Sequence, residues 1–149
     1  MEVKFKAVNP KIGREIPLPQ FATAGSAAMD LHACVDAPVT LKAGERAVIP
    51  TGLAMALPSG AYVALVFARS GLGIKKGVCL SNGVGVIDSD YRGEIAVGLV
   101  NLSAGDYTVQ AGDRIAQLMV VPVVQPTISL VPELDDTDRG SGGFGSTGR

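Results

Sequence analysis

Apolar side chains recur along this chain in short alternating runs that glycine, proline and aspartate separate. Alternation of apolar and polar positions with a period of two is typical of strands that bury one face. Turn residues at 58–60 and 111–113 bound these runs and mark the ends of strands. The pattern predicts strands at 46–57, 61–68, 95–102, 107–110 and 114–124.

Helical signals are sparse by comparison. No window shows a sustained apolar stripe of helical period with capping residues at both ends. A single short helical turn is expected at 70–76, where glycines weaken the helix propensity. Many short strands at regular spacing predict an all-β fold, a sandwich or a barrel. The length of 149 residues fits one domain with a substantial core.

The balance of charge limits the partners that the protein is expected to bind. Lys and Arg number 13 and Asp and Glu number 14, which gives a formal net charge of −1. This balance argues against a broad electrostatic footprint on nucleic acid or on a membrane, although a few cations could still hold a small anion. No segment has the length and hydropathy of a signal peptide or a membrane span. We therefore expect a soluble, cytoplasmic protein.

Three residues that often carry chemistry are expected to be structural here. Cys34 and Cys79 are far apart in sequence and lie in apolar contexts, so buried free thiols are expected rather than a disulfide. His32 is the single histidine, and it lacks the neighbours of a zinc site or a Ser-His-Asp triad. We expect His32 to be a partly exposed strand residue.

The C-terminal segment 139–149 differs in composition from the rest of the chain. It consists mainly of glycine and small hydroxyl residues around one aromatic side chain, Phe144. This composition predicts a flexible tail. Backbone N–H groups freed by glycine, together with hydroxyls and arginines, are also groups that bind phosphate. The chain is therefore expected to divide into a β-domain at 1–138 and a glycine-rich tail at 139–149.

The stretch 88-DSDYRGE-94 carries more charge than a turn between two strands requires. Aspartate is common in turns, so Asp88 or Asp90 taken singly could be a turn residue. In their wider context these residues form part of a series that resembles the homotrimeric dUTP pyrophosphatases (dUTPases). Five stretches carry the resemblance, in order over nearly the whole chain: 24-AGSAAMDL-31, 68-ARSGL-72, 82-NGVGVIDSDYRGE-94, 112-GDRIAQ-117 and 139-RGSGGFGSTG-148.

The resemblance implies a jelly-roll β-barrel or sandwich that assembles as a homotrimer, with active sites shared between subunits and the tail closing over bound nucleotide. In the hairpin, Asp88 matches the general base that orients the attacking water. Tyr91 matches the ring beneath the deoxyribose that excludes a ribose 2′-hydroxyl, and Asn82 matches the amide near the uracil. Core packing for Tyr91 and a turn role for Asn82 remain open. Arg92 and Glu94 are expected to form a local ion pair.

Other residues match the family on its phosphate side. Asp30 matches an acid whose role is to support neighbouring donors, and Asp113 and Arg114 are expected in a turn and an interface. The sequence departs from the family at Ala68, where proline is frequent, and at 27–29. Substrate-binding roles are implied for Arg69, Ser70, Gly71, Gln117, Arg139, Phe144, Gly145, Ser146 and Thr147.

The reaction implied by the resemblance is hydrolysis of dUTP to dUMP and pyrophosphate by attack of water on the α-phosphorus. It would limit uracil incorporation into DNA and supply dUMP for thymidylate synthesis. Mg²⁺ is the implied cofactor, held by triphosphate oxygens and water without a direct protein ligand. Two alternatives stay open, a dCTP deaminase on a related fold and a non-catalytic nucleotide-binding β-domain. Asp88 favours hydrolysis, because such deaminases typically use a glutamate.

Overall fold

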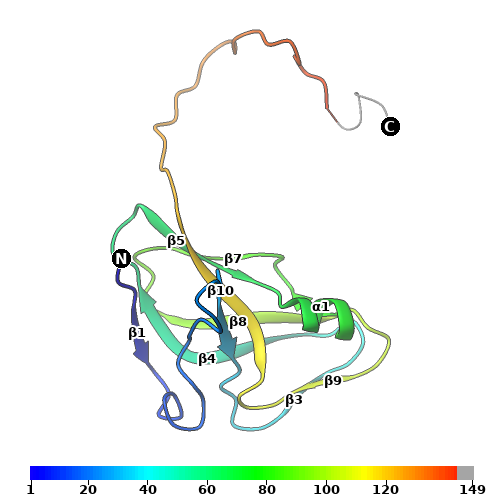
Figure 1. The fold of residues 1–149 in the computed structure, drawn as a ribbon. Helices are drawn as coiled ribbons and strands as arrows, with labels where there is room; N and C mark the ends of the chain where they lie inside the picture. The colour runs from blue at the N-terminus through cyan, green and yellow to red at the C-terminus, as the bar shows by residue number, and fades with distance from the viewer. Residues whose placement is uncertain (144–149) are drawn as a thin grey trace.

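The computed structural model describes residues 1–143, which form ten strands and one helix (Figure 1). In chain order these elements are β1 (Lys4–Ala7), β2 (Met29–His32), β3 (Val39–Leu41), β4 (Arg46–Ala56), β5 (Tyr62–Phe67), α1 (Ser70–Lys76), β6 (Val78–Leu80), β7 (Gly85–Ile87), β8 (Glu94–Asn101), β9 (Tyr107–Val109) and β10 (Arg114–Pro122).

The strands form two four-stranded sheets and one small ribbon, and every pair of neighbouring strands is antiparallel. One sheet has the order β1-β4-β8-β6, the other has the order β2-β10-β5-β7, and β3 pairs with β9. The predicted all-β, jelly-roll-like fold is confirmed. Both sheets contribute fully buried side chains to one core, among them Leu31, Ile49, Leu99 and Leu118. Truncation of one such side chain to alanine costs about 2–5 kcal/mol of stability.

The long strands lie where the alternating pattern predicts them. In β8, Ile95, Val97 and Leu99 are buried and their neighbours face outward or lie half-buried, as a period of two requires. Five shorter strands, β1, β2, β3, β6 and β7, were not among the predicted elements. Each has only three or four residues, which is too few for alternation to be distinguished from a loop.

The predicted helical turn is confirmed as α1, which packs only Leu72 into the core. It ends at Gly77, whose φ of 68° lies in the left-handed region. The Gly77 N–H donates to the carbonyl of Gly73, and this bond closes the last turn. The helix therefore presents Arg69 and Ser70 at its start, directly after β5.

The predictions for the single histidine and the two cysteines hold with one exception. His32 lies half-buried on β2, as expected. Both cysteines are free, and Cys34 is buried, but Cys79 is only half-buried. Cys79 is the middle residue of the edge strand β6, and its two neighbours are the residues that face the core.

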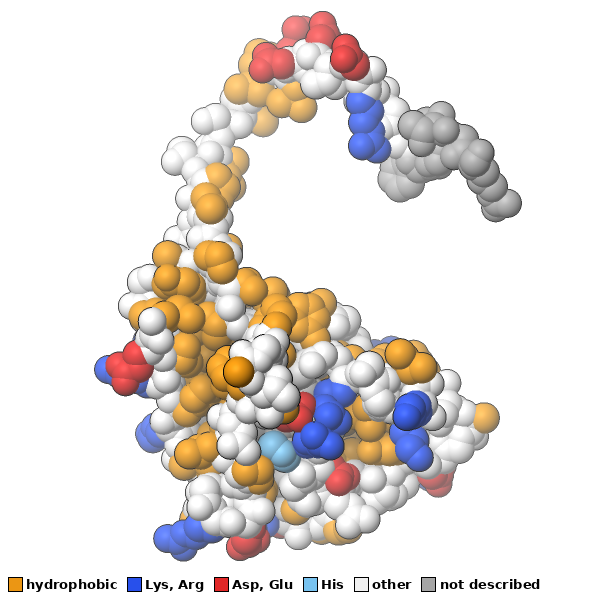
Figure 2. All heavy atoms as spheres, in the orientation of Figure 1, with side chains coloured by type: hydrophobic (Ala, Val, Ile, Leu, Met, Phe, Trp, Pro, Cys, Tyr) orange, Lys and Arg blue, Asp and Glu red, His pale blue; other side chains and the backbone are white. Residues whose placement is uncertain are grey.

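Beyond β10 the chain leaves the body as an extended arm, residues 123–143, that runs away from both sheets (Figure 1). Apolar side chains lie exposed along it (Figure 2), including Ile128 at 91%, Leu130 at 102% and Leu134 at 88% exposure. The division between a domain at 1–138 and a tail at 139–149 stays a prediction. No helix in residues 1–143 is long and apolar enough to cross a membrane.

Candidate active site

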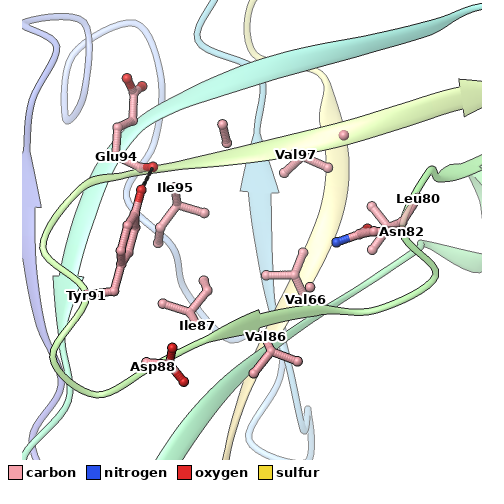
Figure 3. A pocket seen from close by; sticks show the side chains of 13 residues that line it. Val66, Leu80, Asn82, Val86, Ile87, Asp88, Tyr91, Glu94, Ile95 and Val97 are labelled. Atoms are coloured by element: carbon pink, nitrogen blue, oxygen red, sulfur yellow. Dashed lines mark hydrogen bonds between the residues drawn. The ribbon is translucent and has the colours of Figure 1, made fainter.

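A pocket of about 280 Å³ lies between β5, β7 and the start of β8 (Figure 3). Apolar side chains from both sheets form part of its wall, and its polar side chains, Asn82, Asp88, Tyr91 and Glu94, all come from residues 82–94. We call it the β7–β8 pocket; its side chains include Val66, Leu80, Asn82, Ile87, Asp88, Tyr91, Ile95 and Val97.

Asp88 follows β7 directly and stands at the edge of this pocket (Figure 3). The chain turns sharply there, because the Tyr91 N–H donates to the Asp88 carbonyl at 3.2 Å. Asp88 is exposed, and its carboxylate accepts no hydrogen bond from the described part of the chain. Both carboxylate oxygens are therefore available to a water molecule.

Tyr91 and Asn82 lie at opposite ends of the β7–β8 pocket (Figure 3). The Tyr91 hydroxyl donates to the Glu94 carbonyl at 3.1 Å, and the residue is 46% exposed, so core packing does not describe it. Asn82 is also exposed and presents an amide, which offers both a donor and an acceptor to a base. Between them, apolar side chains can hold a flat ring.

The expected ion pair between Arg92 and Glu94 is wrong. Arg92 folds back over its own turn and donates from Nη1 to the carbonyls of Ser89 (2.8 Å) and Tyr91 (2.9 Å). The Glu94 carboxylate instead accepts from the N–H of Gly52 on β4, at 2.7 Å. The two side chains separate because Arg92 lies in the loop whereas Glu94 is the first residue of β8.

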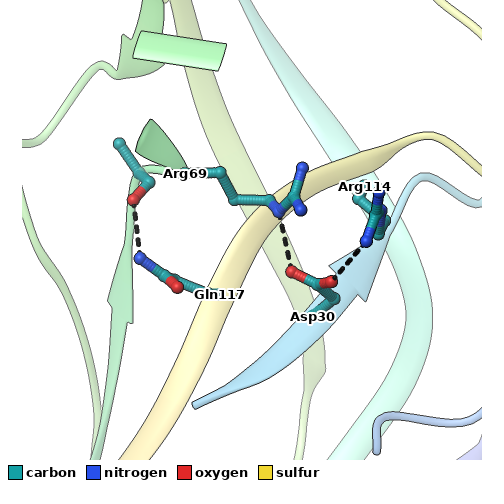
Figure 4. A network of polar contacts seen from close by, with 5 residues as sticks. Asp30, Arg69, Arg114 and Gln117 are labelled. Carbon is teal, nitrogen blue, oxygen red and sulfur yellow. Dashed lines mark hydrogen bonds and ion pairs between the residues drawn. The ribbon is translucent and has the colours of Figure 1, made fainter. Parts of the chain in front are cut away.

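A second group of polar side chains lies where β2, β10 and the end of β5 meet (Figure 4). We call it the Asp30 cluster; it comprises Asp30, Arg69, Arg114 and Gln117. Arg69 Nε donates to Asp30 Oδ1 at 2.7 Å, and Arg114 Nη1 donates to Oδ2 at 3.3 Å. Gln117 Nε2 donates to the carbonyl of Ala68 at 3.0 Å. One carboxylate between two guanidinium groups leaves a local excess of positive charge.

The Asp30 cluster borders a wider hollow of about 590 Å³, lined in part by Asp30, Ala68 and Gln117. Ser70 and Gly71 are exposed at the start of α1, and a Cβ added to Gly71 would meet no atom within 4 Å. The first turn of α1 is therefore open to a ligand, whereas Ala68 and Arg69 before it are partly buried. Burial lowers the pKa of the neighbouring His32; Asp30 opposes this shift, whereas Arg114 and Arg69 act in the same direction.

Sequence reasoning missed the pairing of Arg114 with Asp30. Arg114 and Asp30 are 84 positions apart, and they meet because β10 pairs with β2 in a register that places Gln117 opposite Asp30. The opposite charges were visible in the sequence, but the register was not. Asp113 is a turn residue as expected, since its carboxylate accepts from the N–H of Gln110 at 2.8 Å.

The two groups of candidate residues face away from each other within one chain. Val66 lines the β7–β8 pocket and the next residue, Phe67, lines the hollow beside the Asp30 cluster. Successive side chains of a strand point to opposite faces of the sheet, so the two sites lie on opposite faces of β5. The structure thus brings Asp88, Tyr91 and Asn82 together, but not with Arg69 or Gln117.

The remaining candidates belong to the arm. Arg139 donates from Nε to the carbonyl of Gly142 at 2.9 Å. Phe144, Gly145, Ser146 and Thr147 lie outside the described residues. Within residues 1–143, no group of three or more His, Cys, Asp or Glu side chains is arranged to hold a metal ion.

Comparisons with known proteins define the class to which this β-fold with its polar pocket belongs. The profile of the family described as dUTPase matches residues 14–148. The chain is 51% identical over 148 residues to the deoxyuridine 5′-triphosphate nucleotidohydrolase of Idiomarina loihiensis, with 99% of this chain and 98% of the relative covered. It is 47% identical over 148 residues to the enzyme of the same name from Escherichia coli, with the same coverage.

A solved structure shows the same architecture. The dUTPase of Staphylococcus bacteriophage 80alpha with dUPNHPP superposes with a TM-score of 0.86 at 27% identity, covering 99% of each chain. The chain therefore belongs to the dUTPase family.

Proposed function

We propose that this protein hydrolyses dUTP to dUMP and pyrophosphate. The observation that carries the proposal is an exposed carboxylate, Asp88, at the edge of a pocket of about 280 Å³ that Tyr91 and Asn82 also line. Near full-length similarity to nucleotidohydrolases supports the same reaction. The product dUMP is available for thymidylate synthesis, and removal of dUTP limits uracil incorporation into DNA.

The β7–β8 pocket would hold the nucleoside. The Asn82 amide can exchange hydrogen bonds with the edge of a uracil ring, which carries both donors and acceptors. The Tyr91 ring, at the opposite end, would pack beneath the deoxyribose and occupy the space that a 2′-hydroxyl needs. Steric exclusion suits this discrimination, because an apolar slot rejects one added hydroxyl only weakly.

Asp88 would orient the attacking water and accept its proton. The water oxygen forms a bond to the α-phosphorus, and the bond from that phosphorus to the oxygen bridging to the β-phosphoryl group breaks. Pyrophosphate leaves with the bonding electrons. A carboxylate is a weak base near neutral pH, so alignment of the water with the leaving group supplies much of the rate.

The Asp30 cluster would bind the triphosphate of a nucleotide whose base lies on a neighbouring subunit. Asp30 holds Arg69 through Nε, which leaves the outer guanidinium nitrogens for phosphoryl oxygens. Since Asp88 and Arg69 lie on opposite faces of β5 in one chain, a complete site needs a second copy. A homotrimer with shared sites meets this need and would also cover the exposed apolar arm.

Bound Mg²⁺ would reduce the charge of the triphosphate and fix its conformation for in-line attack. The described residues fit an ion carried by phosphate oxygens and water, because Asp30 already binds two arginines. Residues 1–138 are proposed to form the core domain, and the segment 139–149 is proposed to close over the bound nucleotide. Its proposed contacts are Arg139, Phe144, Gly145, Ser146 and Thr147.

A cytoplasmic location is proposed because both cysteines are free thiols.

Pyrophosphate release from a panel of dUTP, UTP, dCTP and dTTP with Mg²⁺ tests the proposal. We expect turnover with dUTP to exceed turnover with the others by orders of magnitude. Ammonia release from dCTP is measured in parallel. Ammonia without pyrophosphate would identify a deaminase, and absence of both products would leave a nucleotide-binding domain.

A further inference from the structure

The first two residues of β8 are tied to an irregularity in β4. The β4–β8 pairing shifts register between Pro50 and Ala54, so the intervening backbone groups of β4 lose their regular partners on β8. Two bonds replace the lost ladder: the Gly52 N–H donates to Glu94 Oε1 at 2.7 Å, and Thr51 Oγ1 donates to the Ile95 carbonyl at 2.6 Å. A side chain of β8 therefore satisfies a backbone donor of β4.

This irregularity provides a rigid anchor. Gly52 has a φ of 70°, in the left-handed region that side chains disfavour. A Cβ at Gly52 would lie 2.8 Å from Cys34 Sγ and 2.9 Å from Ile12 Cδ1, so the backbone is packed closely against the core. The Gly52 carbonyl accepts from the Val8 N–H at 2.8 Å. Both backbone polar groups of Gly52 are thus engaged, and it has little freedom to move.

Tyr91 is fitted to the same short segment of β8. Its hydroxyl donates to the carbonyl of Glu94, the residue whose carboxylate reaches Gly52 (Figure 3). A Cβ added to Gly93 would overlap the Tyr91 hydroxyl oxygen and lie 2.6 Å from Cζ. Atoms cannot approach so closely, so any side chain at 93 would displace the ring. Gly93 makes room for the ring, and Glu94 fixes the carbonyl that receives its hydroxyl.

We propose that Gly93 and Glu94 are positioning residues that set the sugar selectivity of the β7–β8 pocket by holding the Tyr91 ring. The inference rests on the proposed function and adds a cause for its selectivity. A steric barrier to one hydroxyl works only if the ring stays in place, because a displacement comparable to an oxygen radius opens the space. Because nearly half of the Tyr91 side chain is exposed, packing against the body alone does not fix the ring, and these contacts hold it.

The first test is Gly93→Ala, with Gly105→Ala as its matched control. A Cβ at Gly105 meets nothing within 4 Å, and neither glycine has a positive φ. We expect Gly93→Ala to raise kcat/KM for UTP relative to dUTP by about tenfold, with a small change in the thermal midpoint, because the displaced atoms belong to an exposed ring tip. The control should leave the ratio unchanged.

The second test asks whether the hydrogen bond from the Gly52 N–H to Glu94 maintains selectivity, as distinct from the charge of Glu94 or overall folding. Glu94→Gln keeps an oxygen acceptor for the Gly52 N–H, whereas Glu94→Ala removes it. Glu45→Ala is the control, because the Glu45 carboxylate accepts a backbone N–H from Lys42 at 2.9 Å in a distant turn. We expect loss of sugar selectivity in Glu94→Ala, retention in Glu94→Gln, and only a stability change in Glu45→Ala.

The outcomes are distinct. Unchanged UTP to dUTP ratios in both Gly93→Ala and Glu94→Ala, with dUTP turnover intact in the wild type, would overturn the inference and leave the proposed function standing. If Glu94→Ala lowers the thermal midpoint but leaves the UTP to dUTP ratio unchanged, the Glu94–Gly52 bond only stabilises the fold, and the inference is again overturned. Absence of dUTP turnover in the wild-type protein would overturn the proposed function and the inference together.

Discussion

Asp88 combines exposure with an unengaged carboxylate, which distinguishes it from the other acidic residues of the two sites. Asp30 is held by two arginines, and Glu94 accepts from a backbone N–H. Both are therefore committed to bonds within the chain. Asp88 accepts no hydrogen bond from the described residues, so its oxygens are available to orient a water.

Replacement of Asp88 by asparagine removes the proton acceptor and keeps the shape of the side chain. We expect kcat for dUTP to fall by about 10²–10⁴, which is the usual contribution of a general base, and affinity to change by only a few-fold. Steady-state pyrophosphate release gives kcat, and titration with a non-hydrolysable dUTP analogue gives the affinity. Comparable losses of both would contradict the assignment.

His32 makes the stability of the folded chain depend on pH. Burial lowers the pKa of His32 below its usual 6.5; Asp30 opposes the shift, and Arg114 and Arg69 add to it. Below about pH 6.5 the unfolded chain therefore takes up a proton that the folded chain does not. The free energy of unfolding should fall as pH drops from 6.5 toward the lowered pKa of the folded state.

The measurement is urea unfolding in small pH steps between 5 and 8, for the wild type and for His32→Gln. Because His32 is the only histidine, the variant should lose this part of the pH dependence and keep the part that comes from carboxylates. Parallel curves for the two proteins would show that the environment of His32 does not favour its neutral form.

At the scale of elements, the β7–β8 segment and the arm contribute in different ways. The expected hairpin is wrong, because β7 pairs with β5 in one sheet whereas β8 pairs with β4 and β6 in the other. The segment is thus attached to the body by strand pairing at both ends and by the Glu94–Gly52 bond. The arm leaves the body after β10, and its side chains between 124 and 141 are exposed. Removal of the end of the arm should therefore affect catalysis more than folding.

Truncation before Arg139 tests this directly. We expect the thermal midpoint to stay within a few degrees of the full-length value, because the removed residues add little to the packed core. The value of kcat/KM for dUTP should fall at least about tenfold, since the arginine, hydroxyl and glycine N–H groups proposed to bind phosphate are lost. Unchanged turnover would remove segment 139–149 from the site.

At the scale of the whole molecule, the separation of the two candidate sites on β5 predicts complementation between inactive subunits. Neither Asp88→Asn nor Arg69→Ala should turn over dUTP efficiently alone. When the two are mixed equally and reassembled, about a quarter of the shared sites would combine an intact Asp88 from one subunit with an intact Arg69 from another. Pyrophosphate release by the mixture should recover accordingly.

In the control, the Arg69→Ala variant is replaced by a double variant that carries both Arg69→Ala and Asp88→Asn, so no site contains an intact Asp88. The mixture of that variant with Asp88→Asn should stay inactive. Failure of the first mixture to recover, with a trimeric mass in solution, would show that each subunit completes its own site.

Much of the fold follows from local pattern. The long strands β4, β5, β8 and β10 were predicted within two residues at each end, because alternation over six or more positions is a strong local signal. The short helix was also predicted. Five strands of three or four residues, β1, β2, β3, β6 and β7, were missed, because their existence depends on partners far along the chain. The equally short β9 was predicted at 107–110.

The sequence by itself determined the all-β architecture, the family, and the chemical types gathered in the segment 82–94. Only the tertiary structure decided which of these groups meet. It placed Arg114 against Asp30, sent the Glu94 carboxylate to Gly52 rather than to Arg92, and divided Asp88 from Arg69. The physical reason is that side-chain alternation is encoded over neighbouring residues, whereas strand register and bulges depend on packing between segments distant in sequence.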